Sequence, residues 1–262
     1  MPIEQRTVQG LEGLLSETLT VGRGLAGGHS LWFRGHSCSH YALLPKIMRD
    51  GKAPEAVFER ELRLLTRFRQ RSMAYWPSGY PQNDWEHLFA MQHYGMPTRL
   101  LDWSENLFVA THFALAIHEH GHQDPCNPVV WCIDPIQWNR ATPVLSEFGD
   151  AIHVLTTADD ELDAYRPDTT KRRMRSPIAM FGAHNSVRIV AQRGTFMVWG
   201  NQVASLEQMA NEINAPLWRI EVQGDRHRLA SDLALLGFSE TMVFPELPSL
   251  GSELSHSEGW KQ

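Results

Sequence analysis

Hydrophobic residues recur at helical spacing in the first half of the chain and in short uninterrupted runs in the second half. After Pro54, four apolar residues recur near the 3.6-residue period and predict an amphipathic helix over residues 54–72: Phe58, Leu62, Leu65 and Phe68. Further helices are expected over residues 11–19, 84–93, 106–118, 204–213 and 226–236. Short strands are expected over residues 31–33, 129–133, 187–192, 195–199, 217–222 and 242–244.

This order of elements predicts an α+β fold, because helices come first, strands come later, and regular βαβ alternation is missing. We expect a single domain in which N-terminal helices pack on a mixed or antiparallel sheet. Residues 1–19 are predicted to form an N-terminal helical segment, residues 20–250 the domain, and residues 251–262 a flexible polar tail. Residues 22–28 are predicted to form a glycine-rich loop, and irregular structure is expected over residues 136–185.

The composition allows a substantial core, since 42% of the 262 residues are hydrophobic. No window contains the roughly 18 apolar residues that a membrane helix needs, and residues 1–10 do not resemble a signal peptide. Three cysteines, Cys38, Cys126 and Cys132, indicate neither a disulfide framework nor a zinc pair, so a reduced, cytoplasmic protein is expected. The net charge of −6 argues against indiscriminate nucleic-acid binding but is compatible with a local basic groove.

Polar side chains are concentrated just before the most apolar predicted helix, in MQHYGMPTRLLDWSENLFVATHFAL at residues 91–115. They are Gln92, His93, Thr98, Arg99, Asp102 and Ser104. Residues 98–104 are predicted to form a turn in which Asp102 or Ser104 caps the helix. A helix start offers free N–H donors and partial positive charge, which suits a phosphate. Two plainer interpretations stay open, namely a cap without further function and an internal ion pair between Arg99 and Asp102.

Four segments resemble the FRG domain family, which is named for a Phe-Arg-Gly signature. They are WFRGHS at residues 32–37, the stretch at residues 91–115, VRIVAQRGTFMVWG at residues 187–200 and FSETMVFPELPSL at residues 238–250. The signature corresponds to Phe33-Arg34-Gly35, and the resemblance extends over residues 20–250. The family is found in bacteria and phages, and its name carries no settled biochemistry.

A weaker resemblance, to ADP-ribosyltransferases of the Arg-Ser-Glu type, implies a reaction and an ADP-ribosyltransferase-like fold. Phe33-Arg34-Gly35 is similar to the first motif of those enzymes, and Asp102-Trp103-Ser104 to the second, with Asp in place of the first Ser. Residues 240–245 are similar to the third motif, although Glu240 is one residue out of step and the Glu-x-Glu pair is missing.

The residue types suit cleavage of the nicotinamide–ribose bond of NAD, whose transition state needs a carboxylate near the developing positive charge. Glu240 is the first candidate for that carboxylate and Asp102 the second, while Gln192 is a candidate for orienting the acceptor. Arg34 suits the pyrophosphate because its planar fork matches phosphate oxygens, and Gly35 would let the dinucleotide approach the backbone. The remaining residues expected to line the NAD site are His36, Gln92, His93, Thr98, Arg99 and Ser104.

Two basic segments are candidates for nucleic-acid binding, although each is also compatible with an ordinary solvated surface. The first is a stripe on the predicted helix, formed by Arg60, Arg63, Arg67 and Arg71, and the second is the run Lys171, Arg172, Arg173 and Arg175. A histidine-rich HEHGH, with His118, His120 and His122, is expected to be a surface turn, because Gly121 indicates that the preceding helix ends there. No metal site is predicted.

Together these features favour an NAD-dependent mono-ADP-ribosyltransferase that modifies a nucleic acid, preferably RNA, or a protein. In a bacterial or phage setting it would be a toxin or antiphage effector, with an antitoxin protein as a conceivable partner and no membrane partner. Two alternatives stay open. One is a non-catalytic module that binds a nucleotide or another anion, and the other is a nuclease built on Asp102, His93 and Glu86.

Overall fold

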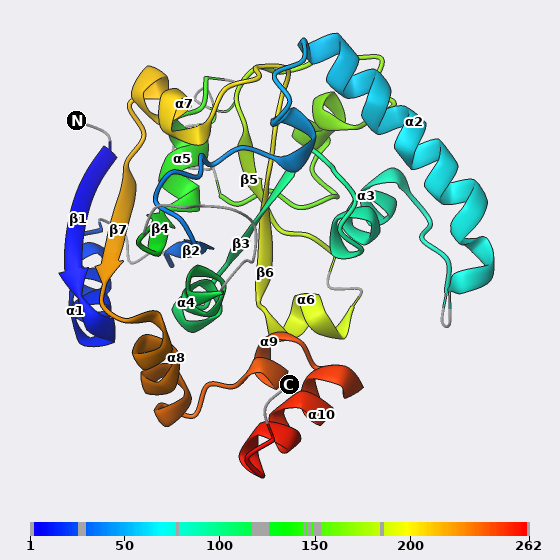
Figure 1. Cartoon of the computed structure of the whole chain (residues 1–262). Coiled ribbons are helices and arrows are strands. Elements are labelled where there is room, and N and C mark those ends of the chain that lie inside the picture. Colours follow the sequence, from blue (N-terminus) through cyan, green and yellow to red (C-terminus); the bar gives the residue numbers. More distant parts are fainter. Residues whose placement is uncertain are drawn as a thin grey trace.

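A seven-stranded sheet forms the centre of the computed structural model of this chain (Figure 1). The structure describes residues 3–25, 30–76, 79–116, 126–143, 145, 148, 153–183 and 186–260. The strands are β1 (Ile3–Gln9), β2 (Trp32–His36), β3 (Leu100–Ser104), β4 (Val129–Ile133), β5 (Ile178–Met180), β6 (Gly194–Val198) and β7 (Leu217–Gln223). Their order in the sheet is β1-β7-β4-β2-β3-β6-β5. β1 and β7 are parallel and the other described neighbours antiparallel, so the predicted single α+β domain with a mixed sheet is confirmed.

The helices cover both faces of this sheet, which curls into a half-barrel (Figure 1). They are α1 (Gly10–Gly24), α2 (Pro54–Ser72), α3 (Asp84–His93), α4 (Leu107–Leu115), α5 (Pro135–Ala141), α6 (Val187–Ala191), α7 (Leu206–Ile213), α8 (Arg226–Leu235), α9 (Glu240–Val243) and α10 (Leu247–Ser257). The 3-10 helices in the described residues are η1 (Lys46–Met48), η2 (Met73–Tyr75) and η4 (Asp160–Tyr165).

The central strand β4 shows why an uninterrupted apolar run predicts a buried strand. All five residues of β4 are buried, because the strand lies between β2 and β7 and both of its faces are covered. Val129, Trp131 and Ile133 enter one hydrophobic core, which contains α5 and α7. Val130 and Cys132 point to the opposite face and pack with α1, α4 and α8. The two cores therefore meet across a single strand.

Helix α2 confirms the predicted amphipathic helix over residues 54–72, with Pro54 in its first turn. Phe58 and Leu65 are buried as the helical period predicts, whereas Leu62 is 42% exposed. The helix packs beside α3, and the two helices share a core with β3, β5 and β6. Arg69, near the C-terminal end of α2, pairs with Asp84 at the start of α3.

Several predicted elements are wrong in type. The chain begins with strand β1 rather than a helix, because residues 3–9 pair with β7 along its whole length. Helix α1 continues to Gly24 into the expected glycine-rich loop, and the expected tail after residue 250 lies largely within helix α10. Residues 187–191 and 240–243 are the short helices α6 and α9 instead of strands. The histidine-rich segment with His118, His120 and His122 lies outside the described residues.

A disulfide bond joins Cys38, just beyond β2, to Cys126, just before β4. The expectation that the cysteines are reduced is therefore wrong for this pair, whose 88-residue separation gave no signal in the sequence. Cys132 is free and buried in β4, where burial raises the pKa of its thiol. None of the helices in the described part of the chain has the length and apolar character needed to cross a membrane.

Candidate functional site

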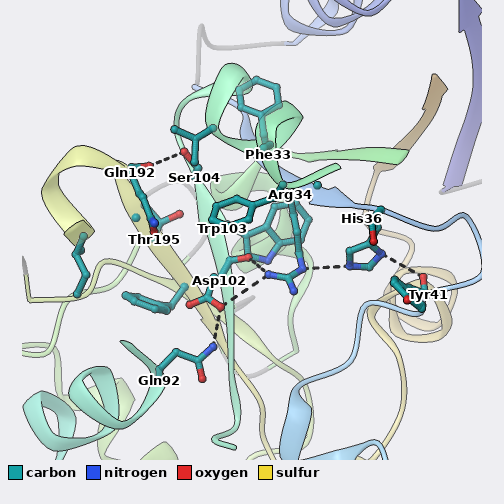
Figure 2. Close-up of a pocket in the computed structure, with 18 of the residues that line it drawn as sticks. Phe33, Arg34, His36, Tyr41, Gln92, Asp102, Trp103, Ser104, Gln192 and Thr195 are labelled. Atoms are coloured by element: carbon teal, nitrogen blue, oxygen red, sulfur yellow. Dashed lines mark hydrogen bonds and ion pairs between the residues drawn. The ribbon is translucent and has the colours of Figure 1, made fainter. Parts of the chain in front are cut away.

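The sheet is split between β2 and β3. The ladder between these strands contains a single residue pair, Phe33 with Ser104, whereas β2 forms five pairs with β4 and β3 forms five with β6. Beyond Phe33 the two strands separate. The Arg34 side chain crosses the gap and donates to the main-chain oxygen of Asp102 at 2.5 Å (Figure 2). The separation opens a cavity of about 690 Å³, a size in the range of small-molecule sites.

Arg34 is the central cation of this cavity. Its Nε donates to Nε2 of His36 at 3.2 Å, and its guanidinium lies 3.9 Å from the Asp102 carboxylate. Its side chain is 17% exposed, and burial lowers the pKa of Arg34 to about 10, although the Asp102 carboxylate opposes that shift. Arg34 therefore stays protonated at neutral pH and keeps donors directed at the cavity.

His36 is neutral and fixes one side of the Arg34 guanidinium. Burial, and then the positive charge of Arg34, lower the pKa of His36 to about 3. Because Nε2 accepts from Arg34, the ring proton lies on Nδ1, which donates to the Tyr41 main-chain oxygen at 3.2 Å. This arrangement holds the guanidinium without adding a second charge.

Asp102 is the carboxylate that faces the cavity. It is the exposed residue in a strand whose other four residues are buried, and its side chain is 53% exposed. Gln92 donates to its Oδ2 at 2.7 Å, and Thr98 in turn donates to Oε1 of Gln92 at 2.6 Å. The threonine hydroxyl thus orients the amide so that its NH₂ faces Asp102. This chain leaves the other carboxylate oxygen available to a ligand.

The cavity lining combines cations, aromatic rings and one carboxylate. The lining cations are Arg34, Arg49 and Arg188, and the lining aromatic rings include Phe33, Tyr41, Phe89, Trp103, Phe113 and Phe196. Among the described lining residues, Asp102 is the acidic one. With three arginines and one carboxylate among the lining residues that the structure describes, the site is suited to a negatively charged ligand that also carries flat rings.

Most of the residues expected at an NAD site line this cavity. They are Arg34, Gly35, His36, Gln92, His93, Asp102, Ser104 and Gln192, which come from β2, α3, β3 and the connection between α6 and β6. Thr98 acts through Gln92. Arg99 and Glu240 are not among the described residues that line the cavity.

Arg99 is part of the core instead of the cavity. Its side chain is 1% exposed, its Nε donates to Glu61 at 2.6 Å, and its other nitrogens donate to the main-chain oxygens of Trp199 and Tyr165. The interpretation of Arg99 as a buried ion-paired residue is correct, but the partner is Glu61 rather than Asp102. Residues 100–104 are a strand rather than a turn. The side chains of Arg99 and Asp102 therefore point away from each other.

Gly35 serves helix packing. A Cβ at this position would overlap the carbonyl oxygen of Ala110 and lie 2.6 Å from the amide nitrogen of Ala114, both in α4. The Phe-Arg-Gly signature therefore brings the backbone of β2 against the backbone of α4. On this face of β2, Gly35 allows close contact with α4 instead of the predicted close approach of a dinucleotide.

Ser104 and Gln192 connect β3 to the segment before β6. The Ser104 hydroxyl donates to the main-chain oxygen of Gln192 at 2.7 Å and accepts from the amide of Asn106 (Figure 2). Asn106, rather than Asp102 or Ser104, caps α4 by accepting from the amide of Phe108. The Gln192 side chain donates to the Val243 main-chain oxygen at 3.1 Å, so it binds α9 to the cavity wall.

Glu240 lies at the start of α9 and is exposed. Its charge acts on His112, where it opposes the lowering of the imidazole pKa by burial. Burial likewise lowers the pKa of His93, with Arg188 as the next cause, so His93 is a neutral group in the cavity wall. Of the two carboxylates proposed from the sequence, Asp102 is the one positioned at the cavity.

Sequence reasoning missed Arg49 and Arg188 as cavity residues. Arg188 lies in α6, which was interpreted as a strand, and its guanidinium stacks over the Phe244 ring at 4.4 Å. Arg49 follows η1, in a segment without helical or strand periodicity. Arg49 lies outside the segments that resemble the FRG family, and the segment that contains Arg188 gave this residue no expected role, so only their position in the folded chain identifies them.

The helical basic stripe is partly neutralised by neighbouring carboxylates. Arg60 pairs with Asp50 at 2.7 Å, and Arg63 pairs with Glu59 at 3.4 Å. For Arg67 and Arg71 the described residues provide no carboxylate within 4 Å. These two arginines are therefore the available cations of α2.

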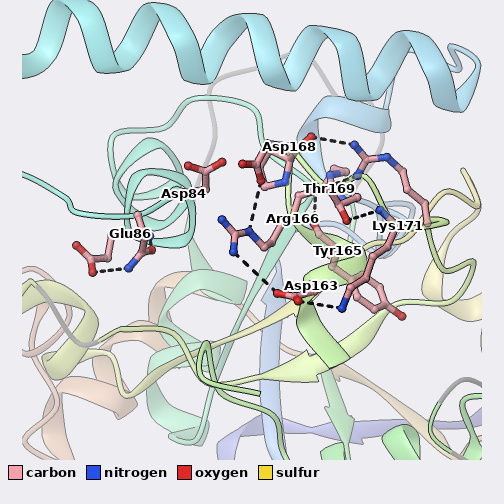
Figure 3. Close-up of polar contacts among 12 residues, drawn as sticks. Asp84, Glu86, Asp163, Tyr165, Arg166, Asp168, Thr169 and Lys171 are labelled. Atoms are coloured by element: carbon pink, nitrogen blue, oxygen red, sulfur yellow. Dashed lines mark hydrogen bonds and ion pairs between the residues drawn. The ribbon is translucent and has the colours of Figure 1, made fainter. Parts of the chain in front are cut away.

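The basic run is partly structural. Lys171 pairs with Asp163 at 2.9 Å within a network of charged residues beneath α2 (Figure 3). Arg173 stacks over the Phe58 ring at 3.8 Å and donates to two main-chain oxygens. Arg172 and Arg175 are exposed, so only part of this segment is available for nucleic acid.

The nuclease alternative has no metal-binding cluster to support it in the described residues. Glu86 accepts from the Gln82 amide and the Asn83 side chain and does not line the cavity. The one group with ligand geometry in the described part of the chain consists of Cys38, His40 and Cys126, and two of its sulfur atoms are joined to each other.

Comparison with known proteins gives one match. The searches of the curated proteins and of the solved structures found none. The sequence model of the FRG domain family matches a range that contains β2, α3, β3 and α4, the elements that supply most of the cavity lining. Residues 29–123 of this chain are an FRG domain.

Proposed function

We propose that this cavity binds NAD and that the protein transfers ADP-ribose to an acceptor. The observation that carries the proposal is the split between β2 and β3, where the Arg34 guanidinium and the Asp102 carboxylate lie 3.9 Å apart in the lining of one cavity. An ADP-ribosyltransferase-like fold belongs to the same proposal. Its support is that the first two resembling motifs lie on neighbouring strands, with Val109, Ala110 and Phe113 of α4 lining the same cavity.

The charges of the cavity fit the two halves of the substrate. The pyrophosphate carries negative charge, and Arg34 and Arg188 offer planar donor groups that match phosphate oxygens. The nicotinamide and adenine rings are flat, and rings such as Phe113 and Phe196 offer faces and edges for packing. A ligand with either feature alone would use only part of this lining.

Asp102 then supplies the carboxylate that the reaction needs. As the bond between nicotinamide nitrogen and ribose carbon breaks, its electron pair leaves with nicotinamide, and positive charge develops on the ribose. The Asp102 carboxylate, held by Gln92, stabilises that charge. The acceptor nucleophile then forms a bond to the same carbon and passes its proton to Asp102. Gln192, which lines the cavity and donates to the Val243 main-chain oxygen, is the residue proposed to orient the acceptor.

The acceptor is proposed to be a nucleic acid, with RNA favoured over protein, because Arg67 and Arg71 offer free positive charge on α2. Modification of a cellular nucleic acid would make the protein a toxin or an antiphage effector, and an antitoxin partner would be expected in that setting. These roles follow from the proposed reaction and depend on it.

The test measures NAD binding by calorimetry and nicotinamide release by chromatography. Arg34→Lys keeps the charge but removes the planar fork, so NAD binding should weaken by about tenfold or more. Asp102→Asn keeps the size of the side chain, so binding should persist while nicotinamide release falls by about 100-fold or more. Glu240→Gln is the matched control and should change neither quantity, because Glu240 is absent from the described cavity lining.

Three outcomes would overturn parts of this proposal. If the wild-type protein does not bind NAD, the proposed substrate is wrong. Binding without nicotinamide release, with or without RNA, favours a nucleotide-binding module. If Glu240→Gln abolishes release and Asp102→Asn does not, the assignment of the carboxylate is wrong.

A further inference from the structure

A second cavity lies at the C-terminal end of α2, where this helix and η2 pass the last turn of α3. Its volume is about 290 Å³, and its walls are formed by Phe68, Arg71, Ser72, Tyr75, Trp76 and Tyr94. A volume at the lower limit for small-ligand sites suits one flat ring system and is too small for a whole dinucleotide.

The aromatic walls of this cavity are held in place. The Trp76 ring forms edge-to-face contacts with Phe68, at 6.1 Å between ring centroids, and with Tyr94, at 6.3 Å. The Trp76 indole nitrogen donates to the Ser72 hydroxyl at 3.0 Å, which satisfies its single donor. Tyr75 and Tyr94 are nevertheless 83% and 63% exposed. Such exposed rings on a fixed frame provide faces against which another ring can stack.

The charge beside the cavity selects the kind of ligand. Aromatic walls alone would also suit an ammonium group through cation–π attraction. Here, however, Arg71 forms part of the wall, and Arg67 lies one turn earlier on α2. Within the described residues neither has a carboxylate within 4 Å, in contrast to Arg63 with Glu59. The local positive charge disfavours a cationic ligand and favours a ring that is linked to an anion.

The second cavity lies directly beside the first. His93 lines the NAD cavity and Tyr94 lines the second cavity, and the two rings touch with centroids 4.8 Å apart. The last turn of α3 is therefore the partition between them. A chain bound in the second cavity would therefore lie next to a wall of the first.

We propose that a single strand of nucleic acid binds here, with one base stacked among Trp76, Tyr94 and Tyr75 and its phosphates on Arg67 and Arg71. Base stacking on aromatic side chains and backbone contacts to arginine are how single strands are bound without base pairing. Binding at this cavity stands on its own geometry. Its role as the acceptor site rests on the proposed function.

The test uses a fluorescein-labelled RNA of about ten nucleotides, with anisotropy measured in the absence of NAD. Tyr94→Leu keeps apolar volume but removes the ring, and binding should weaken by about 5- to 100-fold. A plot of the logarithm of the RNA association constant against the logarithm of the salt concentration has a negative slope. Arg71→Gln should reduce the magnitude of this slope by about 0.7, as expected for one lost phosphate contact. Arg63→Gln is the matched control on the same helix, since Arg63 is paired with Glu59, and should bind within about twofold of wild type.

The outcomes separate this inference from the proposed reaction. Absence of RNA binding by wild type, or unchanged affinity in Tyr94→Leu, overturns the inference whatever the protein does with NAD. Equally tight binding of the same sequence as a duplex also overturns it, because paired bases cannot enter the cavity. If RNA binds as expected but NAD does not, the inference stands and the proposed reaction fails.

Discussion

The disulfide between Cys38 and Cys126 predicts a large change in stability on reduction. The bond closes a loop that contains α2, α3, β3 and α4, and its cysteines are separated by 88 residues. In the chain-entropy treatment, a loop of this length lowers the entropy of the unfolded chain enough to stabilise the folded protein by about 4.6 kcal/mol at 25 °C. Compact structure in the unfolded chain would reduce this value, so a loss of about 2–5 kcal/mol on reduction is expected.

The measurement is denaturant unfolding of the oxidised protein with and without a thiol reductant. Fluorescence and circular dichroism should give coincident transitions if the unfolding is two-state. The double variant Cys38→Ser, Cys126→Ser is the control, because its unfolding should not respond to the reductant. Thiol labelling of the denatured protein should detect one cysteine before reduction and all three afterwards.

Two results would contradict this reasoning. Three reactive thiols in the denatured, unreduced protein would show that the bond does not form. A disulfide that is present, but whose reduction changes the free energy of unfolding by less than about 1 kcal/mol, would show that loop entropy does not control the stability of this fold.

Three further changes test the core and the cavity. Glu61→Gln leaves the buried Arg99 without its carboxylate and should lower the free energy of unfolding by about 3–5 kcal/mol in urea titrations; an unchanged midpoint would contradict the buried pair. Gly35→Ala places a methyl group against Ala110 of α4, so overpacking should cost about 1–3 kcal/mol or more by thermal unfolding, and full stability would contradict that contact. The pKa of His36 in the folded protein is lowered to about 3, so between pH 6.5 and pH 3 the unfolded chain binds a proton that the folded protein does not. From pH 7 to pH 5 the free energy of unfolding of wild type should therefore fall by about 2 kcal/mol more than that of His36→Gln. Equal decreases in the two proteins would contradict the buried neutral ring.

Elements with one clear periodicity were predictable from the sequence. Helix α2 was evident because Pro54 marks its start and apolar residues follow the helical period. β4 was evident because a strand covered on both faces needs a continuous apolar run. β1 was missed because it lies at the sheet edge and its residues are largely exposed, so its sequence is polar.

The site was only partly predictable. The motifs that resemble ADP-ribosyltransferases identified Arg34 and Asp102 as candidates, and both residues line the same cavity in the structure. The partner of Arg99 was not predictable, since Glu61 is 38 residues away on a helix that shows only its amphipathic period. Residues 100–104 were interpreted as a turn because Pro97 and polar residues surround a short strand, and pairing with β6 cannot be read from local pattern. Short elements are decided by tertiary contacts more than by their own residues.

The backbone contact at Gly35 limits how this cavity can change its ligand. Where main chain meets main chain, neither β2 nor α4 can yield space by exchanging one side chain for a smaller one. A shift in ligand preference would therefore have to come from the part of the cavity wall formed by Arg49, His93 and Arg188, which reach in from short helices and their ends. Substitutions that retarget the protein should accumulate on that wall while the Phe-Arg-Gly side stays fixed.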